Sequence, residues 1–412
     1  MKKYLLILFI AASLPFSFSQ TPKVETGIEV LRENNFDVLA GKRVGLITNA
    51  TGVDSKLNST IDILYNAKNV KLAALYGPEH GVRGDFSGGD TVKNYIDKET
   101  GIPVYSLYGK TRKPTPDMLK DIDVLVYDIQ DIGCRSYTFI STMGKAMEAA
   151  AENNIPFIVL DRPNPLGGNK VEGNIVEDGF QTFVSQYKIP YIYGLTCGEL
   201  AELLNNEGML KDGEKCSLTV IPMKGWTRNM SFEETELPWV LTSPHIPHFD
   251  TPEYYAASGI MGELGTLSEG VGYTLPFEIF AADWINADSL AKEMNALELE
   301  GVIFRPINLK PYYGRDKGKE LHGVQIHLTD FRKVNLTSLQ FLFMQVQFEM
   351  FPAKNPFTMA SKERIDFFDN VCGTSKVREL FSKNMKFDDV KDFLNKDVES
   401  FKTLSRKYYL YQ

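Results

Sequence analysis

The chain has 412 residues, of which 24% are charged, and a formal net charge of -8 at pH 7. This acidic balance argues against nucleic acid or an anionic membrane surface as the main partner. The length is enough for two domains, on the usual prior of about 150 residues for each.

Residues 1–20 have the pattern of a secretory signal peptide, with two lysines, an apolar run over 4–10 and small residues after it. The apolar run is too short to span a membrane, and Pro15 interrupts it. We therefore expect cleavage near residue 19 or 20. The mature chain is expected to be periplasmic or secreted, with no segment inserted in a membrane.

Short apolar runs alternate with helical patterns from residue 43 to residue 223. Continuous apolar strands separated by helices are typical of a parallel sheet that is covered on both faces. We predict a doubly wound, mainly parallel α/β domain over residues 21–245. The expected strands are 43–48, 70–76, 104–107, 124–128, 156–160 and 218–223, and the expected helices are 59–67, 116–120, 137–153 and 197–206.

A second, smaller α+β domain is expected over residues 246–412. The proline-rich segment 237–252 has no helical period and is predicted to be the crossover into it. The predicted elements of this domain are a glycine-rich loop at 262–272, helices at 289–297, 336–348 and 390–403, and strands at 302–305 and 324–328.

The loop Gly77-Pro78-Glu79-His80-Gly81 is the most informative part of the sequence. Gly and Pro end the strand 70–76 and turn the chain. An acid, a base and, at Arg83, a guanidinium within so few residues favour a functional loop over a solvated turn. Burial could raise the pKa of Glu79, as an acid catalyst requires, whereas Arg83 would act in the opposite direction.

Polar or charged side chains also follow the other predicted strands. The carboxyl ends of the strands share one edge in a doubly wound sheet, so these side chains could meet across a crevice. The alternative is that strand ends carry polar side chains only because the loops that follow them are exposed to solvent. We favour a shared site. The residues are Asn49, Thr51, Glu79, His80, Asp128, Gln130, Asp161, Arg162 and Lys224.

Several motifs of other enzyme classes are missing. No G-x-G-x-x-G follows the first strand, no G-x-x-x-x-G-K-[ST] occurs, and there is no G-x-S-x-G elbow. Pro247 prevents the helix that would align His245, His248 and Asp250 as metal ligands. The four cysteines show no CxxC pair, which argues against a zinc site and leaves disulfide pairing open. We expect no cofactor and no metal.

Carboxylates and arginines suited to glycoside hydrolysis are present. This reaction uses a protonated carboxyl at the leaving oxygen and a second group for water or the sugar cation. Arg83, Arg135 and Arg162 would suit an anionic substrate, because guanidinium binds a carboxylate with two hydrogen bonds. Pairing with neighbouring aspartates is an equal alternative. The cluster of Lys110, Arg112 and Lys113 is expected to be a solvated turn.

Taken together, several stretches resemble the exo-β-N-acetylmuramidases of the NamZ type. They are residues 76–81, 105–111, 123–130, 137–143, 160–167, 222–226, 237–240 and 267–270. The resemblance implies a Rossmann-like first domain, a cleft between two domains, and release of N-acetylmuramic acid from peptidoglycan fragments without nucleotide or metal. It implies a catalytic role for Glu79. The family pattern has Ser-Pro-Asn where Ser243-Pro244-His245 stands, so no role is carried over to His245.

We therefore expect an exo-acting glycoside hydrolase with Glu79 as general acid, acting on a MurNAc-GlcNAc type of saccharide. His80 and Asp128 would orient the acid or position water. The second catalytic group stays open, and the N-acetyl group of the substrate is one alternative. The main rival is a cell-wall sugar-binding protein without catalysis, and a metal-dependent hydrolase ranks third. The residues expected to bind substrate are Asn49, Arg83, Gln130, Arg135, Tyr137, Arg162, Glu172 and Glu269.

Overall fold

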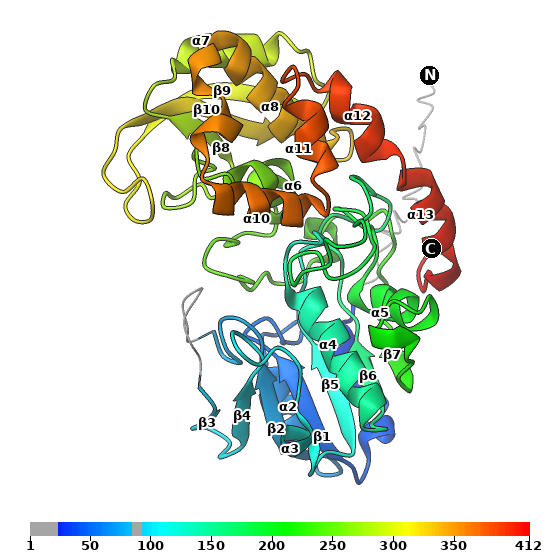
Figure 1. The fold of residues 1–412 in the computed structure, drawn as a ribbon. Coiled ribbons are helices and arrows are strands. Elements are labelled where there is room, and N and C mark those ends of the chain that lie inside the picture. Colours follow the sequence, from blue (N-terminus) through cyan, green and yellow to red (C-terminus); the bar gives the residue numbers. More distant parts are fainter. Residues whose placement is uncertain (1–23, 85–92) are drawn as a thin grey trace, which may run out of the picture.

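The computed structural model describes residues 24–84 and 93–412, and Figure 1 shows two lobes stacked on each other. The predicted signal peptide lies outside these ranges. The first lobe contains a seven-stranded sheet and the second a three-stranded sheet. No helix within the described ranges has the length and apolar character needed to cross a membrane.

The first sheet has the strand order β3-β4-β2-β1-β5-β6-β7, and all of its neighbours are parallel except β3 and β4. The chain builds outward from β1 in one direction through β2 and β4, and in the other through β5, β6 and β7. The predicted doubly wound fold is therefore confirmed. The strands are β1 (Arg43–Thr48), β2 (Lys71–Gly77), β3 (Tyr95–Ile96), β4 (Pro103–Ser106), β5 (Val124–Asp128), β6 (Phe157–Leu160) and β7 (Leu218–Ile221).

Helices cover both faces of this sheet, which is why its central strands are mostly apolar. On β5, Val124 and Val126 pack on the side of α1 and α2, whereas Leu125 and Tyr127 pack on the side of α4 and α5. Successive strand residues point to opposite faces, so each strand supplies both cores. The helices are α1 (Gly27–Glu33), α2 (Thr60–Asn66), α3 (Pro116–Leu119), α4 (Phe139–Glu152) and α5 (Cys197–Asn206).

The second domain is α+β, as predicted. Its antiparallel sheet has the order β8-β10-β9. The strands are β8 (Ile279–Ala282), β9 (Val302–Leu309) and β10 (Leu321–Leu328). The helices are α6 (Thr251–Gly262), α7 (Ala287–Asn295), α8 (Leu336–Met350), α9 (Pro356–Met359), α10 (Lys362–Cys372), α11 (Lys376–Phe381), α12 (Asp388–Asn395) and α13 (Val398–Ser405).

Several elements of this domain differ from the sequence prediction, which did not include β8, α9, α10 or α11. The single helix expected over 390–403 is two helices, α12 and α13, separated at Lys396 and Asp397. Asp397 instead accepts a hydrogen bond of 3.1 Å from the amide of Ile175 in the first domain. Helix α6 was missed within the proline-rich crossover because Pro252 lies in its first turn, where proline is tolerated.

The end of the chain returns to the first domain, where α13 lies near α5 (Figure 1). The Tyr411 hydroxyl donates to Asp161 Oδ2 at 2.6 Å, and the Arg228 amide donates to the Gln412 carbonyl at 2.9 Å. Burial raises the pKa of Asp161 to about 6, against the effect of its hydrogen bonds. This contact ties the second domain to the outer end of the first sheet.

Candidate active site

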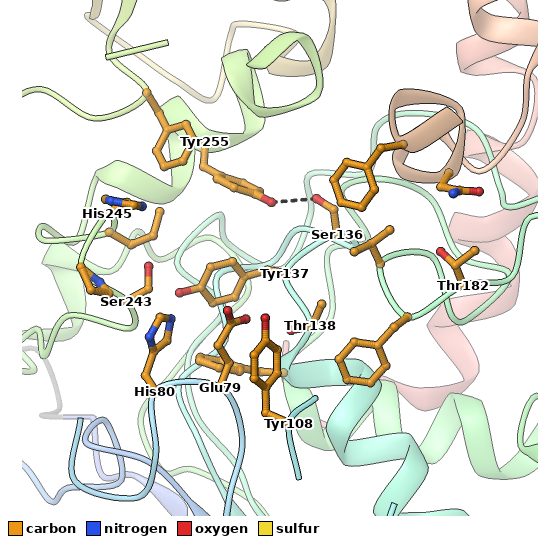
Figure 2. A pocket seen from close by; sticks show the side chains of 18 of the residues that line it. Glu79, His80, Tyr108, Ser136, Tyr137, Thr138, Thr182, Ser243, His245 and Tyr255 are labelled. Carbon is orange, nitrogen blue, oxygen red and sulfur yellow. Dashed lines mark hydrogen bonds between the residues drawn. The ribbon is translucent and has the colours of Figure 1, made fainter. Parts of the chain in front are cut away.

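A cavity of about 820 Å³ lies between the two domains. Its first-domain wall consists of the loops that follow β2, β4, β5 and β6 and the start of α4. The segment 243–246, α6 and the hairpin between β9 and β10 contribute the opposite wall. Figure 2 shows the first-domain side chains below and those of α6 above, pointing toward a common space.

The loop after β2 directs Glu79 and His80 into this cavity (Figure 2). The Gly81 amide donates to the Pro78 carbonyl at 3.1 Å and closes a tight turn. His80 has a φ of 74° and Gly81 a φ of 75°, so both lie in the left-handed region. This conformation is uncommon for a residue with a side chain, and such residues concentrate at functional sites. The turn thus presents an acid and an imidazole side by side.

Tyrosines surround the Glu79 carboxylate. Burial and a side-chain hydrogen bond with Glu79 raise the pKa of Tyr108 to about 12. The Tyr137 hydroxyl shares a hydrogen bond of 2.7 Å with Thr242, and burial raises the pKa of Tyr137. Figure 2 shows the carboxylate lying between the two rings. Among the described residues that line the cavity, Glu79 alone carries a carboxyl group.

Arg112 supplies a positive charge to the cavity. Its guanidinium lies 4.4 Å from the centroid of the Phe183 ring, and it forms no ion pair with any residue that the structure describes. An exposed guanidinium that is held on an aromatic ring can bind an anion. Arg112 is exposed, as the expected solvated turn at 110–113 implies, but the sequence reasoning did not place it in the cavity lining. The signal that could have found it is the position of β4 beside β2, which brings the loop after β4 to the same sheet edge.

His245 also lines the cavity, although the sequence motif gave it no role. Its ring stacks on Tyr313 from the β9–β10 hairpin, with centroids 6.0 Å apart and an interplanar angle of 15°. Burial, and then the charge of His80, lowers the pKa of His245. The two imidazoles therefore face the same space from two segments that lie far apart in the sequence.

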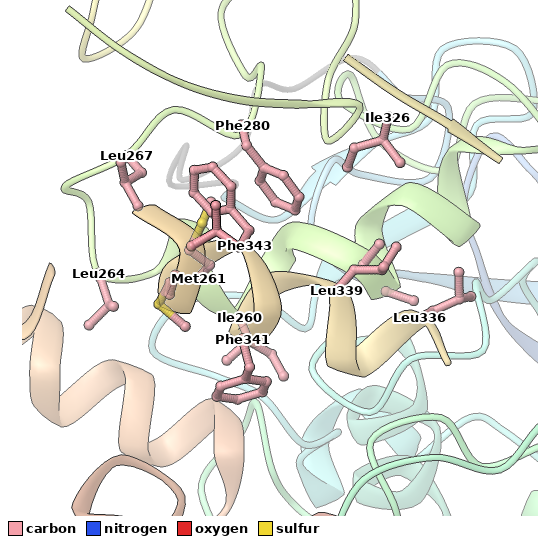
Figure 3. Packing of buried hydrophobic residues seen from close by; sticks show 14 of the residues in the cluster. Ile260, Met261, Leu264, Leu267, Phe280, Ile326, Leu336, Leu339, Phe341 and Phe343 are labelled. Carbon is pink, nitrogen blue, oxygen red and sulfur yellow. The ribbon is translucent and has the colours of Figure 1, made fainter. Parts of the chain in front are cut away.

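Tyr255 reaches the cavity from α6 and shares a hydrogen bond of 3.0 Å with Ser136 (Figure 2). The far side of α6 packs into the core of the second domain, where Ile260 and Met261 lie among side chains of β8 and α8 (Figure 3). The Met261 amide also donates to Gln340 of α8 at 2.9 Å. Packing on one face of the helix thereby fixes Tyr255 on the other.

Asp128 and Arg162, two residues predicted for the site, lie outside the cavity lining and bind each other. Arg162 Nε lies 2.5 Å from Asp128 Oδ1, and Thr60 donates to the other carboxylate oxygen at 2.5 Å. Asp128 is fully buried. The two residues occupy the point where the strand order reverses, between β1 and β5. Side chains fill the crevice that would hold a ligand in related folds.

Other predicted residues at the sheet edge also have internal partners and lie outside the cavity lining. Asn49 accepts two hydrogen bonds from Thr51, and the Gln130 amide donates to two backbone carbonyls. Arg83 forms a bidentate pair with Asp97, with Nε 2.7 Å and Nη2 3.0 Å from its oxygens. Each of these side chains is thus engaged by a partner within the first domain and does not reach the cavity.

Arg135 and Glu172 lie at the junction between the domains. The guanidinium of Arg135 is buried and donates to the carbonyls of Asn174, Ile189 and, in the second domain, Val371 at 2.6–2.9 Å. Glu172 accepts a hydrogen bond of 2.9 Å from the Thr337 amide in the first turn of α8. Both residues hold the two walls of the cavity together and neither lines it.

Glu269 lies within the second domain and is largely buried, with its Oε2 3.6 Å from Nη2 of Arg315. Burial raises the pKa of Glu269. Burial also raises the pKa of neighbouring Glu263 to about 7, and the charge of Glu269 acts in the same direction. Glu269 is not part of the cavity lining. Deprotonation of Glu269 and Glu263 is unfavourable in the folded protein, because burial and the neighbouring negative charge oppose it.

This pair makes a testable prediction about stability. A carboxyl whose pKa is higher in the folded chain than in the unfolded chain loses stabilisation as pH rises from about 4.5 through about 7. We expect Glu263→Gln to raise the free energy of unfolding by ~1–2 kcal/mol at pH 8, with the gain vanishing near pH 4.5. Urea unfolding at both pH values measures it, with exposed Glu293→Gln on α7 as control. A gain independent of pH would contradict the prediction.

Metal-ligand residue types do not gather in the described part of the chain: no group of three or more His, Cys, Asp or Glu side chains there could hold a metal ion. His245 lines the cavity, whereas His248 and Asp250 do not. The cysteines Cys134, Cys197, Cys216 and Cys372 are all buried, and each is a free thiol.

Comparisons with known proteins cover nearly the whole chain. Residues 44–250 match the family model of the exo-beta-N-acetylmuramidase NamZ N-terminal domain, and residues 253–411 match that of the C-terminal domain. The chain is 44% identical over 404 residues to peptidoglycan beta-N-acetylmuramidase NamZ of Bacillus subtilis (strain 168), covering 97% of this chain and 95% of the relative.

Two solved structures of DUF1343 family proteins from Bacteroides fragilis NCTC 9343 share the fold. The first is 60% identical with a TM-score of 0.91, and the second is 29% identical with a TM-score of 0.76. Each comparison covers 95% of this chain and 99% of the solved chain. The similarity therefore extends over both domains and the cavity between them.

Proposed function

Because the chain belongs to the NamZ exo-β-N-acetylmuramidase family and is a glycosidase, we propose that it releases N-acetylmuramic acid from the non-reducing end of peptidoglycan fragments. The observation that carries this proposal is the position of Glu79. It is a carboxyl group on a strained loop, in a cavity between two domains that is otherwise lined by aromatic and neutral polar side chains and a few bases.

Glu79 acts as the general acid in this proposal. It protonates the glycosidic oxygen as the bond to C1 of the muramic acid breaks. Its hydrogen bond with Tyr108 fixes the direction of the carboxyl group. His80 lies on the same turn and orients the substrate or the water beside the acid. Asp128 takes no part in the proposed reaction, because its carboxylate is bound by Arg162 and Thr60.

Arg112 binds the lactyl carboxylate of the muramic acid. It replaces Arg83, Arg135 and Arg162 in this role, since each of these three is engaged by internal partners away from the cavity. A guanidinium forms two parallel hydrogen bonds to a carboxylate, which distinguishes muramic acid from a sugar without the lactyl group. The aromatic wall that includes Tyr137 and Tyr255 packs against the sugar.

The N-acetyl group of the substrate serves as the second catalytic group. Its carbonyl oxygen bonds to C1 as the leaving oxygen takes the proton from Glu79. Water then attacks C1, breaks that new bond and returns a proton to Glu79. This assignment is supported by the lack of a second carboxyl group among the described lining residues, since the two-carboxyl mechanism needs one within about 5–10 Å.

The experiment is product analysis with a MurNAc-GlcNAc disaccharide and a matched GlcNAc-GlcNAc disaccharide. We expect free muramic acid from the first and no cleavage of the second. Proton NMR should show the β-anomer first, because two displacements at C1 retain configuration. Tight binding without any product would favour the sugar-binding alternative, and an α-anomer formed first would exclude participation of the N-acetyl group.

Export is also part of the proposal. The pattern of residues 1–20 supports a signal peptide, and peptidoglycan lies outside the cytoplasmic membrane. The mass of the protein recovered from its native host tests this. A chain that begins near residue 20 is expected, and an uncleaved chain in the cytoplasm would contradict it.

A further inference from the structure

A second cavity, of about 580 Å³, lies on the second domain beside the hairpin that joins β9 to β10. This hairpin is the yellow loop that projects from the sheet in Figure 1. The side chains of interest are Tyr273, Asn308, Lys310, Tyr312, Lys317 and His322, which we call the hairpin site. None of them belongs to the lining of the main cavity.

An aromatic platform forms one side of the hairpin site. Tyr312 stacks nearly parallel on Tyr273, with ring centroids 5.6 Å apart and an interplanar angle of 15°. The Tyr312 amide donates to the Gly272 carbonyl at 2.7 Å, which fixes the backbone below the ring. Even so, Tyr312 is 65% exposed. An aromatic ring that is already fixed but still exposed to solvent can bind the apolar face of a sugar with little further loss of side-chain conformational entropy.

Polar and charged groups complete the hairpin site. His322 and Asn308 share a hydrogen bond of 2.7 Å across adjacent strands and present further polar atoms at the rim. Lys310 and Lys317 form no ion pair with any described residue, whereas nearby Lys319 and Arg315 pair with Asp316. Glu320 also lines this cavity, so its lysines and this one acid leave a net positive charge in a chain whose net charge is -8. This local positive charge favours an anionic ligand.

The hairpin site lies close to the main cavity because one hairpin serves both. Tyr313 lines the main cavity and stacks on His245, while its neighbour Tyr312 lines the hairpin site. Consecutive Cα atoms are about 3.8 Å apart, so this one hairpin forms part of the wall of both cavities. A polymer that enters the main cavity by one end can therefore reach the hairpin site with a more distant segment.

We propose that the hairpin site is an accessory binding site for the peptidoglycan polymer. It takes a sugar ring on Tyr312 and a stem-peptide carboxylate at Lys310 and Lys317, while the main cavity acts on the non-reducing end. The inference rests on the proposed function for the identity of the polymer. It adds a site that the release of a terminal sugar does not itself require.

Sedimentation with purified, insoluble peptidoglycan tests the site without any need for turnover. In the full-length Glu79→Gln protein, Tyr312→Ala is expected to weaken binding about tenfold, as loss of an aromatic anchor does. Lys317→Glu is expected to weaken it similarly at low salt. The matched control is Tyr65→Ala on α2, which is 48% exposed on the first domain and should bind as the parent does.

Cleavage of the MurNAc-GlcNAc disaccharide separates this inference from the proposed function. In the otherwise wild-type protein, Tyr312→Ala should cleave the disaccharide within about twofold of the parent rate, which also shows that it is folded. Equal sedimentation of Tyr312→Ala, Lys317→Glu and the Tyr65→Ala control would overturn the accessory site. A wild-type protein that binds the polymer through Tyr312 but releases no sugar would contradict the proposed function alone.

Discussion

Glu79→Gln is expected to lower kcat for release of muramic acid from the disaccharide by about a thousandfold, because an amide cannot donate the proton that the leaving oxygen needs. Substrate binding should change little, since the amide keeps the size of the side chain and can still accept a hydrogen bond from Tyr108. Steady-state kinetics and calorimetry with the same disaccharide measure the two quantities separately. The control is Glu99→Gln, an exposed acid in the first domain.

A substrate with a better leaving group tests the role more sharply. A nitrophenolate needs no proton to leave, so 4-nitrophenyl β-N-acetylmuraminide should lose far less rate in Glu79→Gln than the disaccharide does. Near-normal cleavage of the disaccharide would rule out Glu79 as the acid. Equal losses with both substrates would show that Glu79 acts on a step other than protonation.

The part of the site that follows from local sequence is the loop after β2. An apolar run that ends in Gly77-Pro78 predicts both the strand and the turn, and the turn alone exposes Glu79 and His80 to the cavity. The sheet was predictable for a related reason, because its strands are mostly apolar and alternate with helices. These features depend on neighbours along the chain.

The rest of the site depends on contacts between side chains that lie far apart in the sequence. Asp128 is the last residue of β5 and Arg162 follows β6. Because β5 and β6 are adjacent in the sheet, the two charges pair and leave no group for a ligand. Tyr255 and Tyr313 come from a helix and a hairpin of the second domain, and nothing in their local pattern points to the first. Charge alone could not decide between pairing and substrate binding for any of the arginines.

Arg112 provides the second large effect, because it is the arginine whose guanidinium stays open to the cavity. Arg112→Gln is expected to lower kcat/KM for the MurNAc-GlcNAc disaccharide by about ten- to a hundredfold, the loss typical of a hydrogen-bonded charge. The effect should fall mainly on KM, since the lactyl carboxylate is bound equally before and during bond breaking. Arg112→Lys should retain part of the affinity through its charge but lose the second parallel hydrogen bond.

A substrate without the lactyl carboxylate shows whether Arg112 binds that group. A disaccharide whose lactyl carboxylate is converted to an amide should be cleaved poorly by the parent and no worse by Arg112→Gln, because the interaction is already absent. Lys110→Gln, a change of equal charge in the same loop but outside the cavity lining, is the control and should leave both substrates unaffected. If Arg112→Gln reduced cleavage of the acid and the amide by the same factor, the arginine would be shaping the wall through Phe183 instead of binding the carboxylate.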